Sequence, residues 1–290
     1  TTPWVRAAAA RTRPQMSARM PGLEEDQEQQ ISAVFNPEHA GILFEGTGHT
    51  FAEILKLSDG TSPMPHFPLN KELAATAKVI TGAVDSQNVV GLLPGKKKEY
   101  VVVSAHIDHT GKIPSFTGDG IFNGAMDNAS GVAAAIEVAR QLQAGPQLER
   151  GVLFVLVTGE EKGLQGSRYF AKLPTVPKKR LIANCNMDMF MPLHELKAVT
   201  MLGIEESTLG DYAREMAGEF GLPVIPDPIP EQNRFTRSDQ YSFIREGIPA
   251  LAFKFGYEKG SEEEKIQTEW LKTRYHAVSD DLAQIGRAHV

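Results

Sequence analysis

From about residue 76 onward, the chain alternates between short apolar runs and longer segments with apolar residues at helical spacing. The run from Tyr100 to Ala105 is rich in β-branched residues, which is typical of a buried strand. Further strands are predicted at 152–158, 181–187 and 249–254, and helices at 131–143, 164–172, 208–220 and 240–246. Residues 77–83 and 88–93 alternate in a way that predicts a hairpin. This order of elements predicts an α/β fold, with a mostly parallel, mixed central sheet and helices on both faces.

The first 75 residues have a different character. The stretch from Arg6 to Gln30 is polar and alanine-rich, and Pro63, Pro65 and Pro68 end the segment as an irregular linker. We expect residues 1–75 to be an incomplete accessory segment with one or two helices at about 37–58. Residues 76–285 are expected to form the main domain, and residues 285–290 a non-native tail.

Composition narrows the range of functions. With a formal net charge of −6, the chain has no basic stripe that could neutralise phosphates, which argues against a nucleic-acid partner. The single cysteine, Cys185, excludes an internal disulfide and leaves the redox compartment open. No apolar run approaches the ~20 residues that a bilayer-spanning helix needs, so no membrane span is expected.

Polar residues follow three of the predicted strands. His106 and Asp108 come after the first strand, Glu160 and Glu161 after the second, and Asp188 after the third. Because open α/β sheets build their sites beyond the carboxyl ends of strands, we expect these side chains to lie close together. A buried carboxylate without a partner is costly, so the two glutamates must either be bound to something or face solvent. The alternative to a site is therefore a pair of solvated side chains in a loop.

Two further candidates lie near predicted helix starts. Asp127 is in the glycine-flanked loop Gly124–Gly131, where it could instead be an ordinary carboxylate at a helix N-terminus. His276 precedes a predicted capped helix, and a lone histidine there is more often structural. Together, two histidines and three carboxylates supply enough ligands for two divalent ions if one carboxylate bridges them. Imidazole with carboxylate suits Zn²⁺, with Mn²⁺ or Co²⁺ as substitutes.

These candidate ligands also follow the order of a known family. The chain resembles the co-catalytic zinc exopeptidases in the series His106-x-Asp108, Asp127-Asn128-x-Ser130-Gly131, Glu160-Glu161, Asp188 and Tyr275-His276. The family includes secreted bacterial aminopeptidases, glutamate carboxypeptidases and glutaminyl cyclases. The resemblance covers about residues 76–285, and it extends to Arg237-Ser238-Asp239 and Gly247-Ile248-Pro249-Ala250.

The resemblance implies a domain organisation and a two-zinc centre. Residues 76–285 would be a metallopeptidase catalytic domain with a zinc-exopeptidase-like fold of the phosphorylase/hydrolase type, truncated at its C-terminus. Residues 1–75 would be a remnant of a protease-associated-type domain. Asp127 would bridge two zinc ions, with His106 and Asp188 completing one site and Glu161 and His276 completing the other.

The resemblance also implies roles for residues that do not bind metal. Glu160 would be the general base, and Asp108 would orient the imidazole of His106. Tyr275 would stabilise the oxyanion, or would be a packed aromatic residue near the metal. Apart from the resemblance, His109 is expected at the rim of the site, with a position behind a ligand or facing the substrate as the alternatives.

The predicted activity is that of a zinc-dependent exopeptidase acting on peptides. An acidic site that could hold a substrate α-ammonium favours an aminopeptidase. The alternatives are a carboxypeptidase, for which Arg234 or Arg237 would have to enter the pocket, a glutaminyl-cyclase-like transferase, and a metal-free binding relative. The resemblance further implies export to the periplasm or the medium, while the oligomeric state is not predicted.

Overall fold

The computed structural model describes Trp4, Ala8 and residues 15–20, 22–23, 33–61, 63–76, 78, 80–112 and 118–284. Contacts divide the chain into two compact units, residues 1–15 with 25–84, and residues 16–24 with 85–290. The expected tail at 285–290 lies outside the described residues. The accessory role of the first unit stays a prediction.

The first unit contains the helices that the sequence predicted at about 37–58. They are a single 3-10 turn at Pro37–His39, α2 (Gly41–Phe44) and α3 (Phe51–Ser58). Thr50 begins α3 with a capping box, in which its side chain accepts the main-chain N–H of Glu53 and its own N–H donates to the Glu53 carboxylate. This pairing satisfies amides that the first helical turn leaves without partners.

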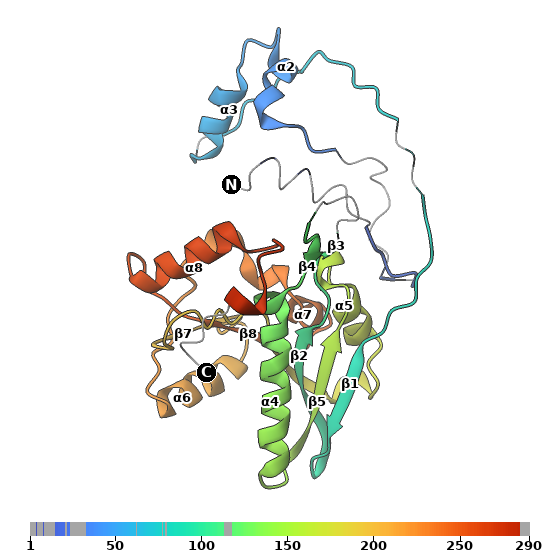
Figure 1. Cartoon of the computed structure of the whole chain (residues 1–290), viewed down its shortest axis with the longest axis vertical. Coiled ribbons are helices and arrows are strands. Elements are labelled where there is room, and N and C mark those ends of the chain that lie inside the picture. The colour runs from blue at the N-terminus through green and yellow to red at the C-terminus, as the bar shows by residue number, and fades with distance from the viewer. Residues whose placement is uncertain are drawn as a thin grey trace. The chain divides into compact units, whose positions relative to one another are not determined.

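The second unit is built on a mixed sheet (Figure 1). Its strands are β1 (Val89–Leu93), β2 (Lys97–His106), β5 (Arg150–Val157), β6 (Leu181–Asn186), β7 (Val199–Leu202) and β8 (Ala250–Phe255). Within the described residues, these six strands have the order β1-β5-β2-β6-β8-β7. The four inner strands are mutually parallel, and the two edge strands pair antiparallel with their neighbours. This sheet confirms the predicted fold class.

The predicted hairpin at 77–83 and 88–93 is wrong. The second segment forms β1, but β1 pairs with β5, with Val90 opposite Val155. The described residues between 77 and 83 form no strand, and residues 77 and 79 lie outside the description. Alternating apolar and polar residues show that a strand is amphipathic, but they do not specify its partner.

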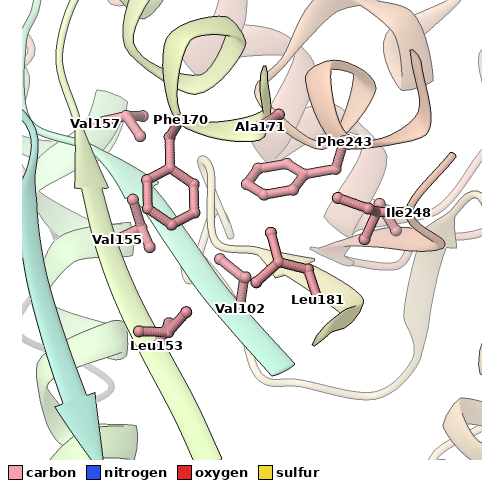
Figure 2. Close-up of a cluster of buried hydrophobic side chains, with 10 residues drawn as sticks. Val102, Leu153, Val155, Val157, Phe170, Ala171, Leu181, Phe243 and Ile248 are labelled. Atoms are coloured by element: carbon pink, nitrogen blue, oxygen red, sulfur yellow. The ribbon is translucent and has the colours of Figure 1, made fainter. Parts of the chain in front are cut away.

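Helices cover both faces of the sheet, as predicted. They are α4 (Ser130–Ala144), α5 (Gln165–Lys172), α6 (Leu209–Glu219), α7 (Gln240–Arg245) and α8 (Glu262–Thr273). Successive residues of a strand point to opposite faces. In β2, Val102 accordingly packs with Phe170 of α5 and Phe243 of α7 (Figure 2). Val103 packs with Ala135 of α4.

Several short elements complete the unit. A two-stranded sheet pairs β3 (Gly111–Lys112) with β4 (Ile121–Phe122). Single helical turns cover Ala125–Ala129, Glu160–Lys162, Lys178–Arg180, Pro230–Gln232, Arg234–Arg237 and Leu282–Gln284. Among the described residues, no helix combines the length and apolar character needed to cross a bilayer.

The end of the chain differs from its prediction. The capped helix expected after His276 is absent from the described residues, where a turn leads to the 3-10 segment Leu282–Gln284. The helix of this region, α8, precedes His276 instead. Its first turn holds Glu262, Glu263 and Glu264, and its buried residues are Gln267 and Trp270, so its sequence lacks a clear apolar stripe.

The start of α4 lies very close to the segment after β6. A Cβ atom on Gly131 would be 2.1 Å from the carbonyl oxygen of Met187 and 2.4 Å from Oδ1 of Asn128. We predict that Gly131→Ala lowers the free energy of unfolding by at least about 1–3 kcal/mol, the usual range for overpacking. This loss outweighs the helix propensity of alanine, which favours the substitution by about 1 kcal/mol.

A matched glycine provides the control for this prediction. Gly218 in α6 is exposed, and a Cβ atom there would have nothing within 4 Å. Gly218→Ala should therefore raise the stability by about 0.4–1 kcal/mol. Urea denaturation midpoints measure both changes, and a Gly131→Ala protein as stable as the parent would contradict the close approach.

Candidate metal centre

Three neighbouring strands bring the first candidate ligands together. β2 lies between β5 and β6, and all three end at the same edge because they are parallel. His106 is opposite Val157 of β5, and Ser104 is opposite Asn186 of β6, which puts Asp188 level with His106. Glu160 and Glu161 follow β5 in a short 3-10 turn at the same edge. The three predicted strand ends therefore converge.

Asp127 reaches this edge from the loop before α4. Gly124 begins the loop in the left-handed region, with φ of 65°, which glycine adopts without strain. The Asp280 carboxylate accepts the main-chain N–H of Met126 at 2.8 Å and that of Asp127 at 3.0 Å. Asp280 is 1% exposed, so these two bonds fix the backbone of the loop in a buried environment.

Asn128 holds the other side of the same loop. Its side-chain amide donates to the carbonyl oxygen of Met187 at 2.9 Å. Its Oδ1 accepts the main-chain N–H groups of Met189 at 3.2 Å and Gly131 at 3.1 Å. One side chain therefore connects the Asp127 loop, the start of α4 and the segment that holds Asp188.

The Asp127 carboxylate faces two groups of donors. Its Oδ1 is 3.2 Å from Nε2 of His106, and that imidazole nitrogen is also 3.6 Å from Oδ1 of Asp188. Its Oδ2 is 3.3 Å from Nε2 of His276, which is 3.1 Å from Oε2 of Glu161. The five predicted ligands thus lie in one site, with the two oxygens of Asp127 directed to different histidines.

The spacing of these atoms fits zinc. Two donors bound to one tetrahedral zinc at about 2.0 Å lie about 3.3 Å apart, close to the separations around Asp127. Within the described residues, Asp188 Oδ1 is buried without a hydrogen-bond partner, and the contact of Glu161 Oε1 is with Nδ1 of His109 at 2.7 Å. A buried, unpaired carboxylate oxygen is costly, so the residues present fit a bound cation.

The same geometry raises the pKa of both histidines. Burial lowers the pKa of His106, but the carboxylates of Asp127 and Asp188 outweigh it and hold that pKa well above its ordinary value. Burial also lowers the pKa of His276, and Asp127 with Glu161 outweighs it, giving a pKa of about 9. Without another cation, protonated imidazoles would therefore neutralise the carboxylates.

The two adjacent glutamates, Glu160 and Glu161, differ in the direction of their pKa shifts. Burial raises the pKa of Glu161, but His109 and His276 outweigh it and hold the pKa at about 2. Burial raises the pKa of Glu160 well above its usual range, and the nearby charges of Asp239 and Asp188 add to that shift. Adjacent glutamates thus have opposite proton affinities, one typical of a ligand and the other of a proton carrier.

Asp108 contacts His106 in a different way from the one expected. Nδ1 of His106 is 3.0 Å from the main-chain carbonyl oxygen of Asp108 and 3.9 Å from its carboxylate. The carboxylate instead accepts the main-chain N–H groups of Glu160 at 3.1 Å and Glu161 at 3.4 Å. Asp108 therefore contacts the imidazole through its backbone and the glutamate turn through its side chain.

Tyr275 stacks on the imidazole of His276, with ring centroids 3.9 Å apart. It packs against an apolar cluster that includes Met126 and Trp270. Burial raises the pKa of its phenol, and the charges of Asp127 and Glu161 add to the shift, so the hydroxyl keeps its proton. The residue is therefore a packed aromatic group whose protonated hydroxyl is able to donate a hydrogen bond.

One of the two arginines considered for a carboxypeptidase is already paired. Arg234 forms an ion pair with Asp227. Arg237 is exposed, and its positive charge lowers the pKa of Tyr275. Of these two arginines, Arg237 is therefore the one whose charge acts on a residue of the site.

Sequence reasoning missed three residues of the site. His109 was expected at the rim, but its side chain is only 6% exposed, and Nδ1 is 2.7 Å from Oε1 of Glu161. Lys254 donates to the main-chain carbonyl of Asp188, and its Nζ is 4.0 Å from the carboxylate. Asp280, which accepts two amides of the Asp127 loop, was given no role. Of these three residues, His109 alone had a signal in the sequence, because it follows His106 by three residues just after the end of a strand.

Comparisons with known proteins identify relatives of this chain. "Aminopeptidase YwaD" of Bacillus subtilis (strain 168) is 27% identical over 225 residues, which are 75% of this chain and 44% of that protein. "Probable lipoprotein aminopeptidase LpqL" of Mycobacterium tuberculosis (strain H37Rv) is 32% identical over 251 residues, with 76% and 46% covered.

A solved structure is similar over the same region. It is that of BSAP, a zinc aminopeptidase from Bacillus subtilis, with a TM-score of 0.50 and 26% identity over 67% of this chain and 44% of the other. The chain thus spans less than half the length of these relatives. Residues 88–290 match the model of peptidase family M28. The matched range contains every ligand of the candidate metal centre, and the chain belongs to peptidase family M28.

Proposed function

We propose that this protein is a zinc-dependent aminopeptidase that removes N-terminal residues from peptides. The observation that carries the proposal is the Asp127 carboxylate, with one oxygen facing His106 and Asp188 and the other facing His276 and Glu161. The family supports a zinc peptidase, and the relatives named above are described as aminopeptidases.

The site would hold two zinc ions. His106 and Asp188 would hold one ion, Glu161 and His276 the other, and Asp127 would bridge them. When bound, a pair of such ions lowers the pKa of a shared water toward 7 and polarises a carbonyl group. Mn²⁺ and Co²⁺ accept the same donor types, so they are the expected substitutes.

Glu160 would move the proton during hydrolysis. Its carboxylate takes a proton from the water as the water oxygen attacks the peptide carbonyl carbon. It then returns this proton to the amine nitrogen as the C–N bond breaks. A raised pKa suits both steps, because the group must accept and release a proton near neutral pH.

Asp108 and Tyr275 would assist the reaction in different ways. Asp108 accepts the main-chain N–H of Glu160 and so fixes the turn that carries the base. Tyr275 would donate a hydrogen bond from its hydroxyl to the oxyanion, a contact that lowers the barrier by about 3 kcal/mol.

The choice between the two exopeptidase activities would depend on the charge of the site. Its excess of carboxylates would attract the α-ammonium group of a free peptide N-terminus, which favours an aminopeptidase over a carboxypeptidase.

A location outside the cytoplasm, in the periplasm or the medium, is part of the same proposal. Its support is the description of the LpqL relative as a lipoprotein aminopeptidase. Detection of the native protein in cell fractions tests it, and a purely cytoplasmic signal would contradict it.

The activity and the base are tested together. Zinc-loaded protein should hydrolyse an aminoacyl-p-nitroanilide and a peptide with a free N-terminus, and an N-acetylated copy of that peptide should survive. Glu160→Gln should reduce kcat by about 10²–10⁴-fold with zinc retained, because the proton carrier is lost. Initial rates and metal analysis of the same samples measure both effects.

The exposed Glu258 provides the control, and Glu258→Gln should keep the parent kcat. Near-parent turnover of Glu160→Gln would refute the base assignment. Cleavage of the acetylated peptide from its C-terminus would indicate a carboxypeptidase. Release of ammonia from an N-terminal glutamine would indicate the transferase, and zinc binding without turnover would indicate a binding relative.

The bridging role of Asp127 predicts a change in metal content. Asp127→Asn weakens both sites, because an amide is a poorer zinc ligand than a carboxylate. After zinc reconstitution and desalting, the variant should retain at most one of the two ions that the parent holds. Mass spectrometry of the metal content measures this, with the exposed Asp211→Asn as control. Unchanged stoichiometry would exclude the bridge.

The raised pKa of His276 predicts how the stability of metal-free protein depends on pH. Burial lowers this pKa, but Asp127 and Glu161 raise it from 6.5 to about 9. Protonation of His276 therefore stabilises the metal-free fold fully below pH 6.5, and this contribution is lost as the pH rises through 9. Zinc must displace the same proton, so its affinity should rise across this window.

Melting temperatures of metal-free and zinc-loaded protein between pH 6 and 9.5 measure this effect. The metal-free protein should lose stability toward alkaline pH, and the zinc-loaded protein should lose less. His276→Gln should reduce the slope of the metal-free protein, while His106 keeps part of it because its pKa is also raised. A His276→Gln protein with the parent slope would contradict the assignment.

A further inference from the structure

His109 is built into the site although nothing assigns it a role there. It follows Asp108 directly after β2, and its side chain is 6% exposed. Its ring lies 6.4 Å from that of Phe122 and 5.6 Å from that of His276. A Cβ atom on Gly124 would be 2.8 Å from Cγ of His109. The surrounding residues therefore hold the imidazole in one place.

The contacts of His109 involve the carboxylates of one of the two donor groups. Its Nδ1 is 2.7 Å from Oε1 of Glu161 and 3.9 Å from Oδ2 of Asp127. Nε2 of His276 is 3.1 Å from the other oxygen of Glu161. The Glu161 carboxylate therefore lies between two imidazoles, one at each oxygen. One nitrogen of His109 and one oxygen each from Asp127 and Glu161 all lie within 4.8 Å of one another.

The alignment of these atoms points to a shared third partner. Within the described residues, Nε2 of His109 has no hydrogen-bond partner, and Nδ1 lies 2.7 Å from Oε1 of Glu161 without the direction that a hydrogen bond requires. Two donors bound to the same ion show this arrangement, because both are directed at the ion rather than at each other. Two donors that each lie about 2.0 Å from one tetrahedral zinc are about 3.3 Å apart. That value lies between the distances from Nδ1 of His109 to Glu161, 2.7 Å, and to Asp127, 3.9 Å.

We propose that His109 is a further ligand of the cation bound by Asp127 and Glu161. This site then has two imidazoles, from His109 and His276, whereas the site at Asp188 has one, from His106. The inference rests on the proposed function only in requiring that the chain binds zinc. Because nitrogen ligands suit zinc and cobalt better than manganese, the site with two imidazoles is the more selective for zinc.

X-ray absorption at the zinc edge tests the proposal directly, since it counts imidazoles per zinc without any assay of activity. The full chain loaded with two zinc ions should show three imidazoles for each pair of ions. His109→Gln should show two, and His109→Ala provides a second variant if the first folds poorly. A residue that only positioned Glu161 would leave the count at two in both parent and variant.

Competition with a zinc chelator provides a second readout. His109→Gln should lower the affinity for one of the two bound zinc ions by about 10–100-fold or more and leave the affinity for the other unchanged. Manganese should then compete better for the weakened site. His194→Gln is the control, because His194 is also a buried imidazole but contacts Gln267 and the carbonyl of Glu195.

The outcomes separate this inference from the proposed function. Three imidazoles in the parent and two in His109→Gln support the inference. A parent that holds two zinc ions with two imidazoles, unchanged by His109→Gln, overturns the inference alone. A parent that binds no pair of zinc ions overturns the proposed function and the inference with it.

Discussion

Repulsion between buried carboxylates is the constraint on which the site depends. Asp127, Asp188, Glu160 and Glu161 converge at one edge of the sheet, with Asp239 close enough to raise the pKa of Glu160 further. Like charges in a poorly hydrated space cannot all be ionised unless positive charge is close by. The histidines and Lys254 supply part of that charge, and the donor spacing fits zinc as the rest. Affinity for cations is thus a consequence of how the acids are placed.

The backbone holds these acids in place by main-chain hydrogen bonds. Asp280 accepts two amides of the Asp127 loop, and Asp108 accepts two amides of the glutamate turn. Asn128 connects the Asp127 loop to the segment that carries Asp188. Each of these three polar side chains fixes backbone groups and leaves the carboxylates of the ligands free. Such support limits how far the ligands can relax away from each other, so the charge must be neutralised in place.

The two halves of the centre differ in ways that bear on hydrolysis. One half combines His106 with Asp188 and Glu160, and a cation there would lie beside the proposed base. The other combines Glu161 with His276 and the inferred ligand His109, and a cation there would be held by more nitrogen atoms. Unequal donor sets give two ions unequal affinities. The bridging carboxylate of Asp127 would then couple a firmly held ion to one that is held less tightly.

The fold class and most of the candidate ligands could be predicted from the sequence, because periodicity is local and parallel strands end at a common edge. The β-branched run before His106, with the acids after the next two strands, was enough to predict where they meet. Asp127 and His276 were candidates from their sequence context, and the family resemblance assigned each of them to a metal site. The partner of β1 could not be predicted, since an alternating pattern carries no pairing information. Nor could the burial of His109, the two amides bound by Asp280, or the use of the Asp108 carbonyl in place of its carboxylate. The sequence by itself determined which donor residues are available and at which edge they gather. Only the tertiary structure decided which oxygen faces which imidazole, because that depends on hydrogen bonds between segments up to about 150 residues apart in the chain.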